Sequence, residues 1–387
     1  MVSLLLAIIY LAFISLGLPD SLLGAAWPIM HEELSVPLSY AGMLSMIISG
    51  GTIVSSILSD RLTRKFGTGL VTAVSVFLTA AAMFGFSISN SFLMLCLFGI
   101  PYGLGAGAID AALNNYVALH YNSRHMSWLH CFWGVGTSIS PYIMGYALNS
   151  GMGWHTGYGI ISVIQIALTV VLFFSLPLWQ KREAASADGE ASTKPLRLVD
   201  AVKIKGVIPV LLTFFSYCAL ESTAGLWISS YLVENRAMAA QTAATFGSLY
   251  FLGITVGRFF SGFVTDRLGD KTMIRLGAVI MLIGIAALLL PTKASLPALI
   301  GIVIVGLGAA PVYPCVIHST PYHFGKENSQ AIIGIQMATA YIGSTFMPPL
   351  FGLLAEHIAI ALYPFYLLFF LILMIVFSEK LNKVVAG

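Results

Sequence analysis

Two short stretches of the chain, SDRLTRK at residues 59–65 and TDRLGDK at residues 265–271, indicate how it folds. Each stretch directly follows a long apolar run, and aligning Asp60 with Asp266 places the two copies 206 residues apart. Short charged clusters between apolar runs of about 20 residues are typical of the connections between membrane-spanning helices. The recurrence of the cluster suggests that the chain consists of two related halves.

Two further patterns repeat in the same order and support this division. The stretch GLGA at 103–106 returns at 306–309, an offset of 203 residues. A Gly-Pro-Gly pattern at 136–145 returns at 343–352, an offset of 207 residues. Three matches at nearly one offset predict parallel, pseudo-symmetric halves, an arrangement that places a binding site between the halves near the bilayer midplane.

The composition predicts that these halves lie in a membrane. The chain has 387 residues, of which 58% are apolar and only 9% are charged, whereas soluble domains carry roughly 25% charged residues. So few charges cannot cover a water-facing surface, but they suit lipid, where backbone polar groups pair inside helices. We predict twelve spanning helices at about 3–28, 38–58, 68–88, 92–119, 126–149, 156–178, 207–233, 241–265, 272–291, 295–320, 328–355 and 361–378.

The longest hydrophilic stretch divides the predicted helices into six and six. We expect a flexible cytoplasmic linker at 180–205, between an N-terminal six-helix bundle (1–179) and a C-terminal six-helix bundle (206–387). The predicted fold class is therefore all-α integral membrane, with twelve transmembrane helices in two six-helix pseudo-symmetric bundles.

The distribution of Lys and Arg predicts the orientation. Sixteen of the nineteen Lys and Arg residues fall on the side of both termini, the exceptions being Arg236, Lys293 and the intramembrane Arg258. Because positively charged loops stay in the cytoplasm, we expect both termini to be cytoplasmic. The expected location is the cell (plasma or inner) membrane.

The Asp-Arg stretches resemble the G-x-x-x-D-R-x-G-R-[RK] motif of the major facilitator superfamily. Residues 262–271 fit this motif except at Asp270, and the first copy has Ser56 and Thr63 where the family prefers glycine. Charge-assisted hydrogen bonds in such a stretch can tie helix ends together in one conformation and release them in another. The alternative is that these are only inside-facing topology charges. We expect gating or structural roles for Asp60, Arg61, Arg64, Asp266 and Arg267. Arg258 could neutralise an acid, but its sequence neighbours favour a structural brace.

Three acidic residues lie inside predicted spans and are the candidates for ion coupling. Asp20, Asp110 and Glu221 have no basic residue within one helical turn in the sequence. A charge at membrane depth costs at least ~2.5–3.5 kcal/mol on insertion scales, and an unpaired, desolvated carboxyl group favours its protonated form. Such a group can carry a proton. The alternative is a neutral acid that hydrogen-bonds a neighbouring helix and serves packing alone.

Polar and aromatic residues near the acids are candidates for substrate binding. Asn114 lies four residues after Asp110, and His130 lies three before Trp133, so each pair shares a helix face. Trp227 follows Glu221 in the seventh span, and Gln336 lies in the eleventh. Amide, imidazole and carboxyl groups pair with hydroxyls, and indole rings stack on the C–H face of a sugar. Packing of these side chains inside a helix bundle is the alternative.

The stretches GLPDSLL (17–23), DAALNNYV (110–117) and LHCFWGVG (129–136) together resemble the fucose permease branch of the major facilitator superfamily. The resemblance covers essentially the whole chain. It implies proton coupling and sugar binding at Asp20 and Asp110, and places the branch's polar residues of the fifth span at His130 and Trp133. The branch also contains sodium-coupled members. We therefore expect a secondary active transporter that moves a small polar solute, a sugar, by proton-coupled symport with alternating access.

Other functional classes fit the sequence less well. A proton-driven exporter of the same fold usually has an Arg in the fourth span and a G-P-x-x-G-G pattern in the fifth, and the chain has only Ser140-Pro141-Tyr-Ile-Met-Gly145 there. Metal-spaced His/Cys clusters, nucleophile elbows and phosphate loops are absent from the sequence, so we expect no enzyme activity, cofactor or metal. The expected partners are a sugar-like small molecule, protons or sodium, and the lipid bilayer. A net charge of +3 does not suggest nucleic acid, and we expect a monomer.

Overall fold

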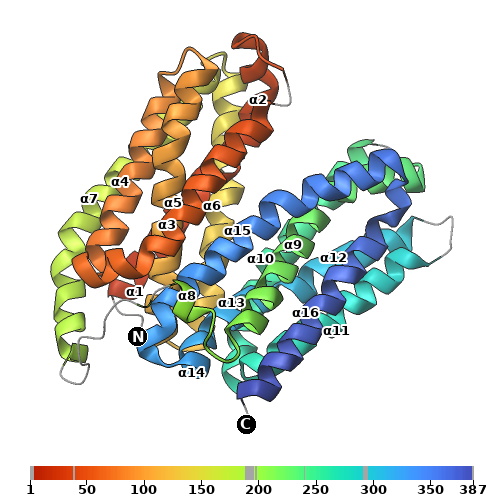
Figure 1. Ribbon diagram of the computed structural model, residues 1–387. Helices are drawn as coiled ribbons and strands as arrows, with labels where there is room; N and C mark the ends of the chain where they lie inside the picture. Colours follow the sequence, from red (N-terminus) through yellow and green to blue (C-terminus); the bar gives the residue numbers. More distant parts are fainter. Residues whose placement is uncertain are drawn as a thin grey trace. The chain divides into compact units, whose positions relative to one another are not determined.

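The computed structural model describes residues 4–37, 40–187, 196, 198–238, 240–290 and 295–385, and every regular element in these ranges is helical (Figure 1). The chain forms two compact units. One unit comprises residues 1–116 and 132–197, and the other comprises residues 117–131 and 198–387.

The first unit is built from seven helices. They are α1 (Leu4–Asp20), α2 (Leu22–Glu33), α3 (Tyr40–Phe66), α4 (Thr68–Ser87), α5 (Phe92–His120), α6 (Ser123–Asn149) and α7 (Gly153–Ala187). The end of α5 and the beginning of α6 belong to the second unit. Helix α7 packs along α4 and α1, where Gln165 donates a hydrogen bond to the Ser15 carbonyl and accepts one from Thr79. These buried polar contacts fix how the three helices align.

The second unit contains the remaining helices. They are α8 (Leu198–Ala201), α9 (Val207–Arg236), α10 (Ala240–Leu268), α11 (Asp270–Leu289), α12 (Leu296–Ala309), α13 (Val312–His318), α14 (Thr320–Phe324), α15 (Lys326–His357), the 3-10 helix η1 (Ile360–Leu362) and α16 (Tyr363–Val385). Helix α9 packs against α10, α15 and α16. At this junction Tyr363 of α16 donates a hydrogen bond to the Ala224 carbonyl of α9.

Each of the twelve predicted runs coincides with a helix or a short series of helices, which confirms the predicted fold class. Three runs are divided: the first is broken at Ser21 into α1 and α2, the tenth consists of α12, α13 and α14, and the twelfth begins in η1 and continues as α16. Prolines at 311 and 321 lie at the starts of α13 and α14, where the missing N–H and fixed φ favour a new helix. An apolar run therefore predicts a span but not its interruptions.

The Asp-Arg stretches lie at helix ends and not in loops, which corrects the sequence-based boundaries. Helices α3 and α10 continue through Asp60 and Asp266 to Phe66 and Leu268. Each is followed by a single glycine with a left-handed φ, 78° at Gly67 and 76° at Gly269. Because a Cβ strains this conformation, glycine at these points allows the next helix to begin at once.

Helices overlap both ends of the predicted linker at 180–205, and the linker itself stays a prediction. Helix α7 runs to Ala187, and α8 occupies Leu198–Ala201. Residues 188–195 and 197, which include Lys194 and Arg197, lie outside the described residues, as does Lys293.

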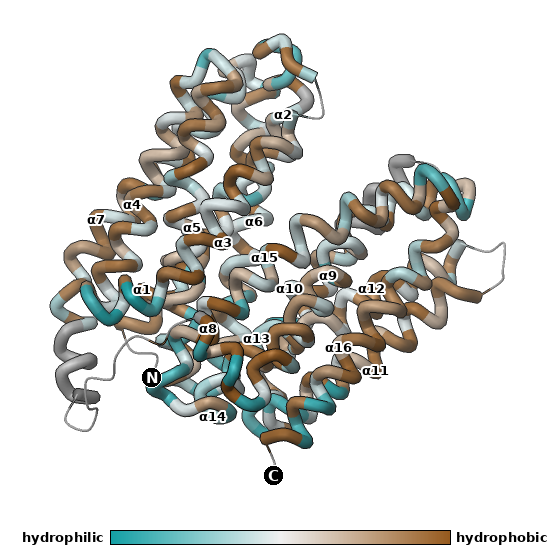
Figure 2. The backbone as a smooth tube through the Cα atoms, viewed as in Figure 1, coloured by the Kyte–Doolittle hydropathy of each residue, from teal (hydrophilic) through white to brown (hydrophobic). Residues whose placement is uncertain are grey.

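Nine helical segments within the described ranges are long and apolar enough to cross a membrane. The long helices outside this set are α6, α10 and α15, which carry His130, Arg258 and Gln336. Figure 2 shows hydrophobic residues along the bodies of the helices and hydrophilic residues at several helix ends. Polar side chains thus lie both in these three less apolar helices and, at Asp20, Asp110 and Glu221, in the apolar ones.

Candidate functional site

In the first unit, the carboxylate of Asp20 is held by two donors from other helices. The Tyr102 hydroxyl of α5 donates to Oδ1 at 2.6 Å, and the Trp133 indole N–H of α6 donates to Oδ2 at 2.9 Å. Asp20 is the last residue of α1 and is solvent-exposed, whereas Tyr102 is buried. An acidic group, a phenol and an indole thus converge from three helices on one accessible point.

Sequence analysis missed Tyr102. The sequence could have indicated Tyr102, because it precedes Asp110 by eight residues, ~2.2 helical turns, and therefore lies on the same side of α5. Asp20 and Trp133 were both predicted as site residues, but their contact was not, because it depends on how α1 packs against α6.

The packing of α1 against α6 depends on two glycines. A Cβ at Gly17 would overlap the carbonyl oxygen of Trp133, and a Cβ at Gly136 would overlap that of Ile14. The two backbones therefore touch directly. One turn further along, the Ser21 hydroxyl donates to the Thr137 carbonyl at 2.6 Å. This close approach sets the distance over which the Trp133 side chain reaches Asp20.

Asp110 and Asn114 form the predicted pair on one face of α5. The Asn114 amide donates to the Asp110 carboxylate at 2.7 Å and to its backbone carbonyl at 2.9 Å. Asp110 is 4% exposed and Asn114 is fully buried. The amide can also accept from a protonated carboxyl group after rotating, so the contact suits either protonation state.

In the second unit, Glu221 of α9 pairs with Arg258 of α10. The guanidinium lies 3.1 Å from the carboxylate, and the two side chains are 4% and 19% exposed, respectively. The expectation that Glu221 is a carboxyl group without a cationic partner is therefore wrong. A search for basic residues within one helical turn of Glu221 could not find this partner, because the contact joins residues 37 positions apart on different helices. The role of Glu221 in proton coupling stays a prediction.

Aromatic side chains surround this ion pair. The Arg258 guanidinium lies over the ring of Tyr313, 5.9 Å from its centroid. The ring of Tyr313 also contacts His130, which is buried, at a distance of 4.5 Å between the ring centroids. Sequence reasoning grouped His130 with Trp133, but the structure places His130 beside Tyr313 and Trp133 beside Asp20.

Trp227 and Gln336 make contacts within the second unit. The Trp227 indole donates to the Pro348 carbonyl at 2.8 Å and its ring packs on Phe351. Gln336 is fully buried and accepts a hydrogen bond from the Thr320 hydroxyl at 3.0 Å. These contacts fix both side chains locally, and their roles in substrate binding stay predictions.

The two Asp-Arg stretches differ in what their acids contact. Asp60 pairs with Arg64 one turn later in α3, at 2.8 Å. Asp266 instead contacts the start of α6, pairing with the Arg124 side chain at 3.1 Å and accepting from its backbone N–H at 3.2 Å. Only the second contact ties two helices together. Arg61 and Arg267 are exposed, and the gating roles of all these residues stay predictions.

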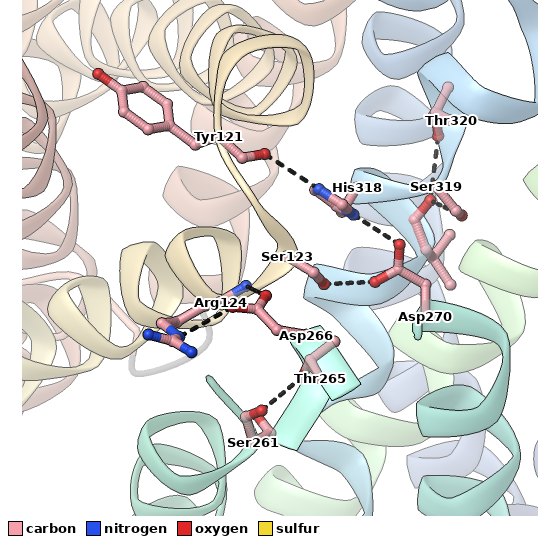
Figure 3. Close-up of polar contacts among 11 residues, drawn as sticks. Tyr121, Ser123, Arg124, Ser261, Thr265, Asp266, Asp270, His318, Ser319 and Thr320 are labelled. Carbon is pink, nitrogen blue, oxygen red and sulfur yellow. Dashed lines mark hydrogen bonds and ion pairs between the residues drawn. The ribbon is translucent and has the colours of Figure 1, made fainter. Parts of the chain in front are cut away.

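Asp270, the residue that departs from the motif, joins three segments of the second unit (Figure 3). It begins α11, accepts a hydrogen bond from Ser123 at the start of α6, and lies 2.6 Å from the ring Nδ1 of His318 at the end of α13. The other ring nitrogen of His318 lies 3.2 Å from the Tyr121 carbonyl. The departure from the motif therefore introduces a polar cluster.

Helices that coincide with the twelve predicted spans, several of them carrying ionisable side chains, fit the fold of a multi-pass membrane transporter. The family model of the Major Facilitator Superfamily matches residues 9–245 and 209–381. The chain belongs to this family, which confirms the resemblance of the Asp-Arg stretches.

The chain is similar to several curated proteins. It is 24% identical over 279 residues to Bypass of stop codon protein 6 of Saccharomyces cerevisiae, which covers 66% of this chain but only 56% of that protein. It is 21% identical to the hexuronate transporter of Bacillus subtilis, over 68% of this chain and 64% of that one. It is 22% identical to the sodium-dependent glucose transporter 1A of Mus musculus, over 91% and 89% of the two chains.

Solved structures show the same fold. The FucP transporter in the outward conformation matches with a TM-score of 0.79 at 15% identity, over 97% of this chain and 98% of that chain. The proton:xylose symporter XylE matches with a TM-score of 0.79 at 13% identity, over 98% and 95% of the two chains.

Proposed function

We propose that this protein is a secondary active transporter that takes up a small polar solute of the sugar class by proton-coupled symport with alternating access. The observation that carries the proposal is the Asp20 carboxylate held between the Tyr102 hydroxyl and the Trp133 indole. These are groups that a polyhydroxylated ligand can use, because hydroxyls exchange with such donors and the indole face stacks on a sugar ring.

Asp110 is the proposed coupling acid, and Asp20 assists it. Asp110 is buried, so charging it is costly unless its surroundings compensate, and protonation allows the loaded carrier to reorient without moving that charge. Asn114 contacts the carboxylate directly and links its protonation to the packing of α5. Glu221 ranks behind these two acids because Arg258 already balances its charge.

The remaining assignments extend the same proposal. Asn114, His130, Trp133, Trp227 and Gln336 are proposed to contact the substrate. The charged residues of the Asp-Arg stretches are proposed to control opening on the cytoplasmic side, where both termini are proposed to lie.

The relatives support the sugar class by what their names state. One solved structure of the same fold is a proton:xylose symporter, and another is described as the Escherichia coli fucose:proton symporter FucP. The mouse relative is named a sodium-dependent glucose transporter, which makes sodium the ion to test against protons.

Transport by the purified full-length protein in liposomes tests the proposal. The substrates are labelled hexoses, 6-deoxyhexoses, pentoses and hexuronates, each offered with an inside-alkaline pH gradient or an inward sodium gradient. We expect at least one of these sugars to accumulate above its external concentration under the pH gradient, and a protonophore to abolish this. Accumulation driven only by sodium would overturn proton coupling, and no accumulation of any sugar would overturn the substrate class.

A further inference from the structure

The buried ion pair of the second unit, Glu221 with Arg258, shares no residue with the contacts of Asp20 in the first unit. Its two members differ in access: the Arg258 side chain is 4% exposed and the Glu221 side chain is 19% exposed. A polar solute that reaches the pair therefore meets the carboxylate first, with the guanidinium beneath it.

Arg258 is oriented by more than its counter-ion. Its guanidinium lies over the Tyr313 ring, and that ring is packed between Phe214 and His130 at centroid distances of 4.6 and 4.5 Å. Glu221 is attached to a backbone fixed by the Tyr250 hydroxyl, which donates to its carbonyl oxygen at 3.0 Å. The carboxylate is the more exposed member of the pair.

We propose that Arg258 binds a carboxylate of the substrate and that Glu221 is its resident counter-ion, so that the transported sugar is a sugar acid. This inference rests on the proposed function and specifies its substrate class. An arginine suits the task because its planar fork matches a carboxylate with two parallel hydrogen bonds and stays charged.

The exchange balances charge and protons. In the empty site, the Glu221 carboxylate neutralises the Arg258 guanidinium. When a sugar acid binds, its carboxylate takes the place of the Glu221 carboxylate, and Glu221 takes up one proton from water. The buried site is neutral before and after, so no uncompensated charge is left inside the protein. One proton thus enters at this site with each substrate anion, in addition to the coupling proton proposed at Asp110.

Several other ionisable groups surround the pair in the part of the second unit that the structure describes. The ionisable groups that act on Glu221 or Arg258 are Tyr217 on α9, Tyr313 on α13, and His130 and Cys131 on α6, with Tyr250 on α10 and Cys218 on α9 beside them. Glu221 is the only carboxyl group in this set.

A second Arg–Glu pair in the same unit provides a matched control. Arg275 of α11 and Glu379 of α16 form two hydrogen bonds of 2.6 Å, with side chains 53% and 34% exposed. This pair joins helix ends at the surface and has no buried cation to offer a ligand. Breaking it tests for general effects of removing an Arg–Glu pair.

Binding of D-glucuronate to the full-length protein in detergent tests the exchange. We expect wild-type affinity for glucuronate to rise as the pH is lowered. Glu221→Gln, which mimics the protonated form, should bind glucuronate at least ~10-fold more tightly and lose this pH dependence, since coupled sites act on each other reciprocally. Glu379→Gln should behave like the wild type. Unchanged or weaker glucuronate binding by Glu221→Gln would overturn the exchange.

Removing the cation gives the complementary result and guards against misfolding. The double variant with Glu221→Gln and Arg258→Gln leaves no unpaired buried charge, and it should lose glucuronate binding. Retained glucuronate binding by this folded double variant would overturn the assignment of Arg258.

Transport distinguishes this inference from the proposed function. Proton-driven accumulation of glucuronate in liposomes supports both. Proton-driven accumulation of neutral sugars that glucuronate does not inhibit would overturn the sugar-acid inference and uphold the proposed function. Proton-independent movement of every sugar and sugar acid would overturn the proposed function itself.

Discussion

His318 and Asp270 lie on different helices, and the ring Nδ1 of His318 is 2.6 Å from the carboxylate of Asp270. The other ring nitrogen faces the Tyr121 carbonyl at 3.2 Å. A carbonyl and a carboxylate are both acceptors, so both ring nitrogens can donate only when the imidazole carries two protons. A protonated His318 can donate to both acceptors, next to the position, 270, at which the family motif has a cationic residue.

Replacing His318 by Ala should destabilise the protein. The two hydrogen bonds of the imidazole disappear, and Asp270 loses one of its partners. We expect a loss of about 2 kcal/mol, since a bond to a charged group contributes about 1.5–3 kcal/mol, measured by thermal unfolding in detergent. His357→Ala, at an exposed position of the same unit, should have little effect. Equal stability of the two variants would contradict this role for the cluster.

Tyr102→Phe should weaken substrate binding by about 10-fold, the effect of losing a hydrogen bond to a charged group. The phenyl ring keeps the packing of α5, so the change should appear in KM and leave folding intact. Uptake kinetics in liposomes measure it. Tyr142→Phe is the control because that side chain is 82% exposed. An unchanged KM for Tyr102→Phe would separate Asp20 from the substrate.

Asp110→Asn should bind substrate and exchange it across the membrane but fail to accumulate it. The amide mimics the protonated carboxyl group and cannot release a proton, so the carrier is no longer coupled to the gradient. Counterflow and gradient-driven uptake measure the two activities separately. Asp200→Asn, in an exposed pair with Lys203, should retain both. Full accumulation by Asp110→Asn would move the coupling role to another acid.

Gly17→Ala should be destabilising by about 1–3 kcal/mol, the usual cost of overpacking. Its Cβ meets backbone of α6 that cannot move aside without shifting the helix. Gly24→Ala provides the contrast, because nothing lies within 4 Å of the added Cβ, and it should gain up to about 1 kcal/mol of helix propensity. Thermal unfolding of the two variants measures the difference, and a stable Gly17→Ala protein would disprove the close contact.

Cysteines introduced at Ser186 and Asn382 should react with a membrane-impermeant thiol reagent only from the cytoplasmic side. Ser186 lies in the predicted cytoplasmic linker, and Asn382 lies near the C-terminus, which is also predicted to be cytoplasmic. Labelling of whole cells and of inverted vesicles compares the two sides. Reaction of either cysteine in intact cells would reverse the predicted orientation.

The helices were predictable because each span needs about 20 apolar residues, and Asp110 and Asn114 were predictable as neighbours because one helix carries both. Contacts between helices were not. The pairing of Glu221 with Arg258 depends on the relative rotation of α9 and α10, and the reach of Trp133 to Asp20 depends on α1 and α6 touching at glycine. The break at Ser21 was missed because apolar residues continue on both sides of it.

The glycine contact between α1 and α6 also makes Trp133 an optical reporter. Since main chain touches main chain at Gly17 and Gly136, the indole stays at a fixed distance from Asp20 as long as the two helices move together. Its emission then reports what occupies the carboxylate and not the movement of one helix past the other. A protein in which Trp133 is the single tryptophan would show substrate arrival without an attached dye.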